Sequence, residues 1–259
     1  MVDQNQFPLD DIDPETNFLP FHSCKYYSDE SLRELNSLNV ENFSLFHVNV
    51  RSMAKNGETL SHYLTETESK FSVIALTETW LTPSNSSLYE LPDYNHVCLL
   101  RNRRRGGGVS IHLTDSLIYK ERPDLNVMTD DCEILFVEIK IETKSYLVGV
   151  IYRPPSGNVA DFLEQLTTTL CKLNSVPSTC YVCGDFNLDL TLSDQHSMVQ
   201  TFLDLFHSSS FIPLIDKPTR VTSESASLID NIFTNSLLDS HSAGILVADI
   251  SDHYPVFCF

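Results

Sequence analysis

The sequence predicts an α/β fold with four layers, a four-layer α/β sandwich in which two mainly antiparallel β-sheets pack face to face with helices outside. The chain has 259 residues, of which 42% are hydrophobic, and this is enough to bury the core of one large domain. Residues 43–77 follow a strand-helix-strand pattern, and the short apolar segments after them are separated by turns, as in antiparallel hairpins. Helical segments then recur between further strands, which favours separate helix and strand layers.

Residues 1–42 are expected to form an N-terminal extension, and residues 43–259 the domain itself. The extension is polar, is interrupted by three prolines, and has a helical pattern only at residues 28–38. Because proline lacks a backbone N–H and interrupts regular structure, we expect the extension to dock loosely on the domain, if at all.

Apolar periodicity predicts the elements of the domain in order. A strand at residues 43–50 leads into a helix over 57–70 and a strand at 71–76. Two later helices are expected over residues 159–173 and 196–207, where apolar residues recur at helical spacing. The other apolar segments, which are bounded by turn residues, predict strands at residues 96–100, 109–113, 134–141, 146–152, 179–183, 229–234, 244–248 and 254–259.

The charge of the chain restricts its partners. Lys and Arg number 17 against 35 Asp and Glu, which gives a net charge of −18 and argues against broad, nonspecific attraction to nucleic acid. Residues 101–105 form a local basic patch, which we interpret as a phosphate clamp in preference to a solvated loop or a nuclear address. The glycines at 106–108 are interpreted as a turn that lets this patch approach another backbone. A bound divalent cation would screen the acidic groups from the phosphates. We therefore predict that the chain contacts a short stretch of nucleic acid and that this binding is strongly sensitive to salt.

The seven cysteines are odd in number and scattered, and no apolar signal segment leads the chain. We therefore expect reduced thiols in an intracellular protein. Cys180 and Cys183 are interpreted as small apolar residues of a buried strand rather than half of a zinc site, because no second pair follows at suitable spacing. No run approaches the roughly 18 apolar residues that span a bilayer, so we expect no membrane association.

Polar side chains recur at the ends of the predicted strands, where a rigid scaffold can present them to a shared cleft. These residues are Asn49, Glu78, Tyr152, Asp185 with Asn187, Asp230, and Asp252 with His253. One acidic strand end is ordinarily a solvated turn. The ordered set, however, contains a carboxylate suited to a metal, a base for water, and donors that neutralise phosphate charge, which are the groups that phosphodiester hydrolysis requires.

Eight short motifs, in this order, resemble those of the endonuclease/exonuclease/phosphatase superfamily. They are Asn49-Val50-Arg51-Ser52-Met53, Thr77-Glu78-Thr79-Trp80-Leu81, Gly106-Gly107-Gly108-Val109, Ile151-Tyr152-Arg153-Pro154-Pro155, Gly184-Asp185-Phe186-Asn187, Pro218-Thr219-Arg220, Leu228-Ile229-Asp230 and Ser251-Asp252-His253. They are especially similar to the apurinic-endonuclease-like domain that precedes reverse transcriptase in non-LTR (LINE-type) retrotransposons. The likeness covers residues 43–259, and Cys24-Lys25-Tyr26-Tyr27 resembles a segment often found just upstream in such elements. The resemblance implies a DNase I-like fold.

Glu78 is the expected ligand of Mg²⁺, a hard cation that takes one or two carboxylates and keeps several waters, with Mn²⁺ as the alternative ion. The resemblance implies that Asn49 lies beside Glu78 and that Asp252 lies near the metal. Asp185 is expected to be the base that orients or deprotonates the attacking water, with Asn187 on the same side of an extended backbone.

His253 is expected to donate to a nonbridging phosphate oxygen, while Asp230 holds the imidazole in the right tautomer and favours its charged form. Tyr152 would add a hydroxyl donor to the phosphate. Further contacts with the substrate are expected from Thr219, Arg220, Ser251, Arg51 and Arg104. Among these, Ser251 is expected to orient the neighbouring Asp-His pair.

These residues favour a Mg²⁺-dependent DNA endonuclease that nicks one strand by attack of water on phosphorus and leaves a 3′-hydroxyl. In retrotransposons of the family that the chain resembles, this end primes reverse transcription at the insertion site. We expect DNA as the partner, a monomer, and a nuclear location if the substrate is genomic DNA. The sequence ends one strand past His253, so we expect an isolated domain, a truncated element or a gene fragment without a polymerase.

Two other interpretations stay open. The chain can be another member of the same superfamily that acts on an abasic site, a lipid headgroup or a phosphoinositide, because substrate choice lies in loops while the core chemistry is shared. It can also be a catalytically silent remnant that binds a partner, since an acidic surface fits a protein partner as well as DNA.

Overall fold

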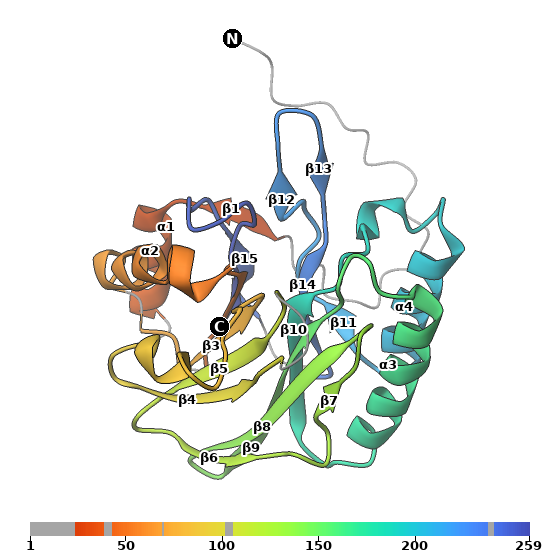
Figure 1. Ribbon diagram of the computed structural model, residues 1–259, viewed down its shortest axis with the longest axis horizontal. Coiled ribbons are helices and arrows are strands. Elements are labelled where there is room, and N and C mark those ends of the chain that lie inside the picture. The colour runs from red at the N-terminus through yellow and green to blue at the C-terminus, as the bar shows by residue number, and fades with distance from the viewer. Residues whose placement is uncertain (1–23, 39–42, 69, 102–105, 238–240) are drawn as a thin grey trace.

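Two seven-stranded β-sheets form the centre of the structure (Figure 1). The computed structural model describes residues 24–38, 43–68, 70–101, 106–237 and 241–259. The first sheet has the strand order β1 (Lys25–Tyr27), β15 (Ala243–Leu246), β16 (Val256–Cys258), β2 (Leu45–Asn49), β3 (Val73–Thr77), β5 (Val109–Thr114), β4 (Tyr94–Leu99). The second has the order β11 (Ile212–Pro213), β14 (Asp230–Thr234), β10 (Thr179–Asp185), β9 (Lys144–Tyr152), β8 (Glu133–Ile141), β6 (Ile118–Glu121), with β7 (Val127–Met128) also paired to β8.

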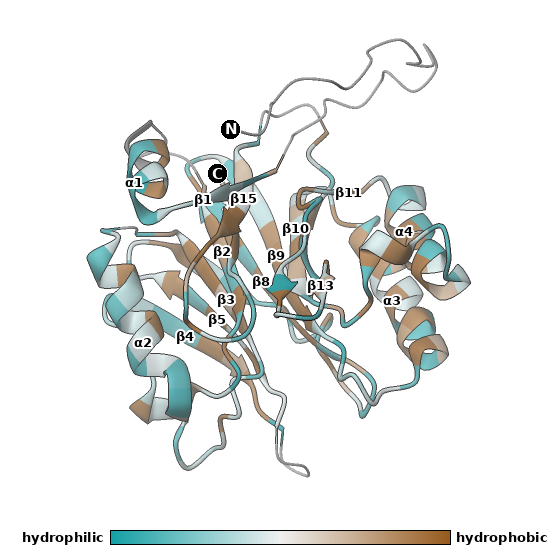
Figure 2. Ribbon diagram, turned by 90° about the horizontal axis from the view of Figure 1, so that it is seen from above, coloured by the Kyte–Doolittle hydropathy of each residue, from teal (hydrophilic) through white to brown (hydrophobic). Residues whose placement is uncertain are grey.

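The helices of the described chain lie outside the two sheets (Figure 2). Helices α1 (Asp29–Leu38) and α2 (Met53–Glu66) cover the first sheet, and α3 (Val159–Leu173) and α4 (Ser197–Ser208) cover the second. Two 3₁₀ turns, η2 (Ser86–Leu88) and η3 (Leu190–Leu192), lie in connections. A two-stranded ribbon of β12 (Arg220–Val221) and β13 (Ala226–Ser227) projects from one end of the sandwich (Figure 1). This four-layer arrangement confirms the predicted fold class.

Both sheets are mixed, and antiparallel pairs predominate. Among the described strand pairs, those that run parallel are β1 with β15, β2 with β3, and β9 with β10. The two central parallel pairs are buried on both faces, and every residue of β2 and β3 is buried. Strands covered on both faces have continuous apolar sequences instead of an alternating pattern, which explains why these segments are easily predicted as strands.

Two hydrophobic clusters hold the layers together. The larger cluster fills the space between the sheets, with Ile111, Phe136 and Val150 among its members, and extends beneath α3 and α4. The smaller cluster, which includes Phe46 and Leu60, lies between the first sheet and the helices α1 and α2. Burial of these side chains fixes how the two sheets stack, and the stacking determines which strand ends meet.

Helix α3 has the predicted bounds, because local signals define both its start and its buried face. The side-chain oxygen of Asn158 accepts a 2.9 Å hydrogen bond from the N–H of Ala160 and caps the first turn. Phe162, Leu166 and Leu170 then recur at intervals of four and are buried. Helix α2, in contrast, begins at Met53 rather than at residue 57, since its first turn is anchored by a tertiary contact, in which the N–H of Met53 donates to the carbonyl oxygen of Thr79 at 3.0 Å.

Residues 24–38 correct the expectation of a loosely docked extension. Strand β1 pairs with β15 at the edge of the first sheet, and Leu32 of α1 is fully buried in the smaller cluster. The ring of Tyr27 meets that of Phe257 edge to face at 5.2 Å, and a Cβ on Gly244 would lie 2.3 Å from the Tyr27 ring. A strand of three residues is too short to give a period, so tertiary packing alone reveals it. Residues 1–23 and 39–42 lie outside the described residues.

The cysteines agree with the expectation of reduced thiols, since all seven are free. Cys180 and Cys183 are fully buried in β10, which confirms their interpretation as core residues. In the part of the chain that the structure describes, no helix is long and apolar enough to cross a bilayer. The strands that the sequence did not predict (β1, β6, β7, β11, β12 and β13) have two to four residues each, too few for a pattern to stand out.

Gly184→Ala is expected to destabilise the protein by about 2–3 kcal/mol, because overpacking at a rigid backbone position costs this much. A Cβ at Gly184 would lie 1.9 Å from the carbonyl oxygen of Ile151 on the neighbouring strand. Gly57→Ala, within α2, is the matched control. Its Cβ would meet only the flexible Met53 side chain, at 3.3 Å, and we expect a gain of about 0.5–1 kcal/mol from helix propensity. Urea unfolding of both variants tests the prediction, and equal stability of Gly184→Ala and wild type would contradict it.

Candidate active site

The strand ends that carry the predicted site residues meet at one edge of the two stacked sheets. Tyr152, Asp185 and Asp230 are direct neighbours across β9, β10 and β14, because the register pairs Asp185 with both of the others. Side chains in register on adjacent strands point to the same face. On the first sheet, Asn49 ends β2, and Glu78 follows β3 directly. The parallel pairing of β2 with β3 and of β9 with β10 brings all four carboxyl ends to the same edge.

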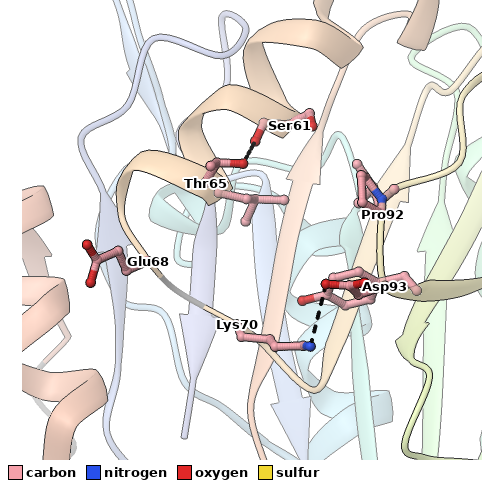
Figure 3. Close-up of a pocket in the computed structure, with 9 residues that line it drawn as sticks. Ser61, Thr65, Glu68, Lys70, Pro92 and Asp93 are labelled. Carbon is pink, nitrogen blue, oxygen red and sulfur yellow. Dashed lines mark hydrogen bonds and ion pairs between the residues drawn. The ribbon is translucent and has the colours of Figure 1, made fainter.

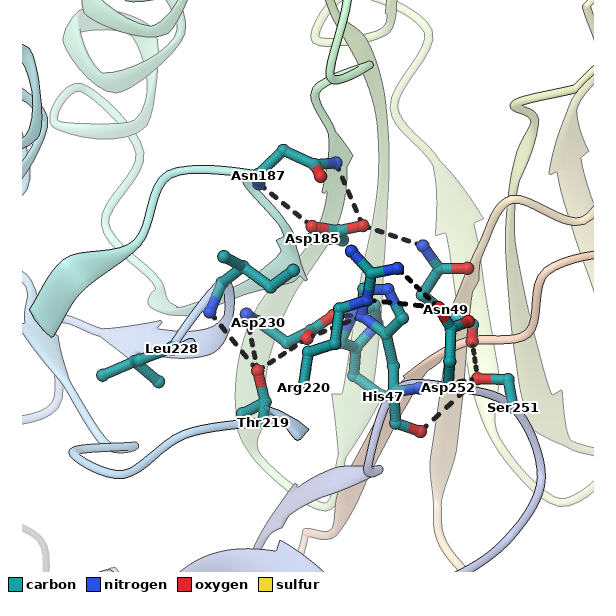
Figure 4. A network of polar contacts seen from close by, with 12 residues as sticks. His47, Asn49, Asp185, Asn187, Thr219, Arg220, Leu228, Asp230, Ser251 and Asp252 are labelled. Atoms are coloured by element: carbon teal, nitrogen blue, oxygen red, sulfur yellow. Dashed lines mark hydrogen bonds and ion pairs between the residues drawn. The ribbon is translucent and has the colours of Figure 1, made fainter. Parts of the chain in front are cut away.

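Asn49 links the two sheets. Its buried amide nitrogen donates to Oε1 of Glu78 at 3.0 Å. The same nitrogen donates to Oδ2 of Asp185 at 2.8 Å (Figure 4). Its amide oxygen accepts the backbone N–H of Arg51 at 3.0 Å. One side chain therefore sets the separation of two acidic groups that belong to different sheets.

Glu78 lies on the floor of a pocket of about 390 Å³. Its backbone adopts a φ of +50°, an uncommon conformation for a residue other than glycine, and the side chain remains partly exposed. The Tyr152 hydroxyl donates to its Oε1 at 3.1 Å, and the Trp80 indole N–H donates to its Oε2 at 3.3 Å. Burial and the charge of Glu78 raise the pKa of Tyr152, so this phenol stays a donor at physiological pH.

Asp185 is fully buried and is held by three hydrogen bonds. Besides Asn49, the backbone N–H of Asn187 donates to its Oδ1 at 3.0 Å, and the Asn187 amide donates to its Oδ2 at 3.1 Å. Burial, together with the charge of Asp230, raises the pKa of Asp185 to about 7, although His253, Asn49 and Asn187 partly oppose the rise. A carboxyl group with this pKa can accept a proton near neutral pH.

His253 and Asp230 form a buried ion pair. Nδ1 of His253 lies 2.9 Å from Oδ2 of Asp230. Burial alone would lower the pKa of His253, but the charge of Asp230 and this hydrogen bond raise it to about 9. For Asp230 burial acts in the opposite direction and would raise the pKa, but His253 and His47 bring that pKa well below its usual range. Because Asp230 is the acceptor, Nδ1 carries the proton, and Nε2 is the nitrogen left to face a substrate.

Ser251 ties the last loop to the first strand of the site. Its hydroxyl donates to the carbonyl oxygen of Asn49 at 2.6 Å and accepts the N–H of His253 at 3.1 Å. The contacts are those expected of a residue that orients the Asp-His pair.

Thr219 contacts the carboxylate and the backbone of Asp230. It is fully buried; its hydroxyl donates to Oδ2 of Asp230 at 2.7 Å and accepts the N–H of Asp230 at 3.1 Å (Figure 4). These contacts position Asp230, and a contact of Thr219 with the substrate stays a prediction.

Asp252 lines the pocket, but its carboxylate is occupied by two arginines. Oδ2 accepts from NH1 of Arg51 and from NH2 of Arg220, the latter at 2.7 Å. Although burial opposes the shift, these guanidinium groups lower the pKa of Asp252 to about 2. Both arginines are half-exposed at the pocket rim, where they can reach a substrate. The remaining predicted contact, Arg104, lies outside the described residues.

Two residues of the site had no predicted role. Arg153 is buried, and its guanidinium donates to the carbonyl oxygens of Phe186 and Asn187, each at 2.7 Å, which braces the loop after Asp185. His47 is fully buried, with Nε2 at 3.6 Å from Oδ1 of Asp230. His47 lies two residues before Asn49 in an extended strand, and this even spacing, which puts both on one face, is the signal that could have found it.

Three potential metal-binding side chains lie close together at this site. Within the described residues, the side chains of Asp185, Asp230 and His253 offer ligand atoms that lie within 4.8 Å of one another. Another pocket, of about 290 Å³, lies between α2 and β4 and contains none of the predicted site residues (Figure 3). Its polar contacts include the 3.8 Å ion pair of Lys70 with Asp93, both of which are exposed. We therefore assign no catalytic role to this pocket.

Comparison with known proteins agrees with this geometry. The sequence pattern of the endonuclease/exonuclease/phosphatase family matches residues 37–253, whereas no curated protein matched the chain significantly. Among solved structures, the endonuclease domain of TRAS1, a telomere-specific non-LTR retrotransposon, is similar with a TM-score of 0.63 and 15% identity over 83% of this chain and 96% of that one.

Two further solved structures share the fold. The AP endonuclease LMAP of Leishmania major has a TM-score of 0.67 and 14% identity over 83% of this chain and 86% of its own. TDP2 of D. rerio, solved with a single-strand DNA product, has a TM-score of 0.61 and 15% identity over 83% of this chain and 97% of its own. At these identities the likeness establishes the fold.

Proposed function

Because this chain belongs to the endonuclease/exonuclease/phosphatase family, with residues 37–253 matched, we propose that it is a Mg²⁺-dependent DNA endonuclease that nicks one strand by phosphodiester hydrolysis. The observation that carries the proposal is the hydrogen-bonded convergence of Glu78, Asn49 and Asp185 with the Asp230–His253 pair. The cut leaves a 3′-hydroxyl.

The oxygen donors of the pocket fit a hard divalent cation. Glu78 presents a partly exposed carboxylate, and the amide nitrogen of Asn49 holds its Oε1 in place. Oδ1 of Asp252 is buried without a hydrogen-bond partner among the described residues, which is the condition expected of a ligand atom that awaits a cation. Oxygen ligands of this kind suit Mg²⁺ or Mn²⁺. Bound there, the ion would neutralise charge that develops on the phosphate oxygens.

The chain's own groups activate the attacking water and neutralise the phosphate, and a solvent water protonates the 3′-oxygen that leaves as the P–O3′ bond breaks. Asp185, with a pKa of about 7, takes a proton from the attacking water, while Asn49 and Asn187 hold its carboxylate in place. His253, with a pKa of about 9, is an imidazolium at neutral pH and donates from Nε2 to a nonbridging phosphate oxygen. The Tyr152 hydroxyl is a second donor at the same pocket.

The retroelement branch of the family is the proposed context. The order and content of the eight motifs support it, and the likeness to the TRAS1 endonuclease domain agrees in fold. In such an element the 3′-hydroxyl left by the nick would serve as a primer for reverse transcription, and the enzyme would work in the nucleus on genomic DNA.

Wild-type protein is expected to convert supercoiled plasmid to open circles with Mg²⁺ and to leave it intact in EDTA. A DNA polymerase should extend the nick directly, because the product carries a 3′-hydroxyl. An abasic duplex and a phospholipid, tested in parallel, separate this proposal from the other activities of the superfamily. Absence of nicking with either Mg²⁺ or Mn²⁺, or nicks that a polymerase cannot extend, would contradict the proposal.

A further inference from the structure

A buried acid holds an arginine in the wall of the active-site pocket. Glu133, at the start of β8, is fully buried, and its Oε1 lies 2.5 Å from NH2 of Arg101. Its Oε2 accepts the backbone N–H of Gly108 at 2.6 Å. Burial raises the pKa of Glu133, and the charge of Arg101 and the N–H of Gly108 oppose the rise. A buried carboxylate is stable only when it is paired and hydrogen-bonded, so Glu133 fixes the position of the Arg101 guanidinium.

The turn at Gly106–Gly108 leaves space for the Arg101 guanidinium because its residues have no side chains. Gly106, Gly107 and Gly108 all have φ between +71° and +91°, the region that favours glycine. A Cβ on Gly107 would lie 2.4 Å from Oε1 of Glu133 and 3.0 Å from Cζ of Arg101. The N–H of Trp80 donates to the carbonyl oxygen of Gly107 at 2.8 Å, which joins the turn to the segment that carries Glu78. Position 107 must therefore be glycine, because a side chain there would collide with Glu133 and Arg101.

Arg101 faces the pocket that holds the catalytic groups. It lines the same 390 Å³ space as Glu78, Tyr152 and His253, beside Trp80. The ion pair with Glu133 is made through one nitrogen, and a guanidinium has five N–H donors in a fork that matches a phosphate. In a chain of net charge −18, Arg101 adds to Arg51 and Arg220 at the same pocket a local excess of positive charge, which lowers the cost of bringing in a second phosphate.

We propose that Arg101, held by Glu133 on the Gly106–Gly108 turn, is a binding residue for the DNA backbone phosphate next to the scissile one. The inference rests on the proposed function. His253 and Tyr152 serve the scissile phosphate, and Arg101 takes its neighbour on the same strand through charge-assisted hydrogen bonds. This role differs from that of Arg51 and Arg220, whose charge is shared with Asp252 at the rim.

The test compares two double variants that leave the net charge unchanged. Arg101→Gln/Glu133→Gln removes both charges of this pair and leaves no buried charge unpaired. Arg122→Gln/Glu138→Gln is the matched control, because Arg122 and Glu138 form a 3.4 Å ion pair and do not line the active-site pocket. Trp80 is the single tryptophan of the chain and adjoins Arg101, so its fluorescence reports duplex DNA binding in EDTA.

The Arg101/Glu133 variant is expected to bind DNA about tenfold more weakly and to raise KM for nicking without lowering kcat. The slope of log Kd against log salt concentration should fall by about 1, the loss of one phosphate contact. Arg101→Lys, which keeps the charge but not the fork, should retain the salt slope and bind more weakly than wild type. The control should match wild type in all three measurements.

Unchanged Kd and salt slope in a folded Arg101/Glu133 variant that still nicks DNA would overturn the inference and leave the proposed function intact. A fall in kcat with unchanged KM would also overturn it, because that result indicates a structural effect on the catalytic groups. Failure of wild type to bind or nick DNA would overturn the proposed function, and the inference with it.

Discussion

His253→Ala is expected to lower kcat for plasmid nicking by about 10²- to 10³-fold, the loss that follows removal of one donor to a developing phosphate charge. The imidazolium at this position is charged at neutral pH because Asp230 raises its pKa to about 9. DNA binding, measured by Trp80 fluorescence in EDTA, should change much less. His62→Ala is the matched control, since its side chain is 71% exposed on α2 and pairs only at the surface with Glu66.

The pH profile separates this role from a structural one. In wild type the rate should rise as Asp185 loses its proton near its pKa of about 7, because only the carboxylate can act as a base. It should fall again as His253 loses its proton near its pKa of about 9, because the neutral imidazole is a weaker donor. The variant should lose the alkaline limb and keep the acidic limb at a higher pH, because His253 no longer opposes the rise in the pKa of Asp185. Unaltered profiles in wild type and variant would reject the assignment of His253.

Loss of His253 also leaves the buried Asp230 carboxylate without its cation, which can cost about 3–5 kcal/mol of stability. His253→Gln addresses this, because its amide can still donate to Asp230. Equal losses of kcat in two variants of different stability, measured by urea unfolding, would show that the effect is chemical. A variant that regains activity in proportion to its stability would contradict the catalytic role.

Glu78→Gln is expected to lower nicking by about 10²- to 10³-fold at any Mg²⁺ concentration, because the amide keeps the shape of the side chain but not the charge that attracts the cation. Without metal, the variant should be nearly as stable as wild type, since its oxygen can still accept from Asn49 and Tyr152 and only the 3.3 Å hydrogen bond from the Trp80 indole N–H is lost. The control is Glu66→Gln, an exposed acid on α2.

A readout independent of activity is the effect of Mg²⁺ on thermal unfolding. A cation that binds only the folded protein raises Tm, and the rise grows with the logarithm of its concentration above Kd. Wild type and Glu66→Gln should gain Tm on addition of Mg²⁺, and Glu78→Gln should not. Nicking by Glu78→Gln at the wild-type rate, or an undiminished rise in Tm, would show that Glu78 does not hold the metal.

The hydrogen-bond partners of Thr219 and Asp252 could not be predicted from the sequence. Both residues lie in motifs that the sequence singled out, and both contribute to the site, but their partners are 11 and 201 positions away. A hydroxyl at residue 219 can face a substrate or a buried carboxylate, and nothing local decides between them. In the structure the Thr219 hydroxyl faces the carboxylate of Asp230, because a buried carboxylate needs hydrogen-bond donors.

The Arg101–Glu133 pair illustrates the same limit. The sequence indicates a basic patch and a glycine turn that approaches another backbone, and both interpretations agree with the contacts of Arg101 and Gly108. It does not indicate that the turn closes on an acid at the start of β8, since Glu133 looks like any polar residue before an apolar strand. Only the packing of the turn against β8 makes that acid the anchor of the pocket wall.

By itself, the sequence determined the element types, the bounds of α3, α4 and the long strands to within two residues, and the candidate residues at the strand ends, because periodicity and turn chemistry act over a few neighbouring positions. The motifs also led us to expect Asp230 beside His253. The tertiary structure alone decided where α2 begins and which other charges are paired: Asp252 with two arginines, and Glu133 with Arg101. The physical reason is that stacking the two sheets excludes water from one shared edge. Charged groups brought together there must satisfy one another, whatever their distance along the chain.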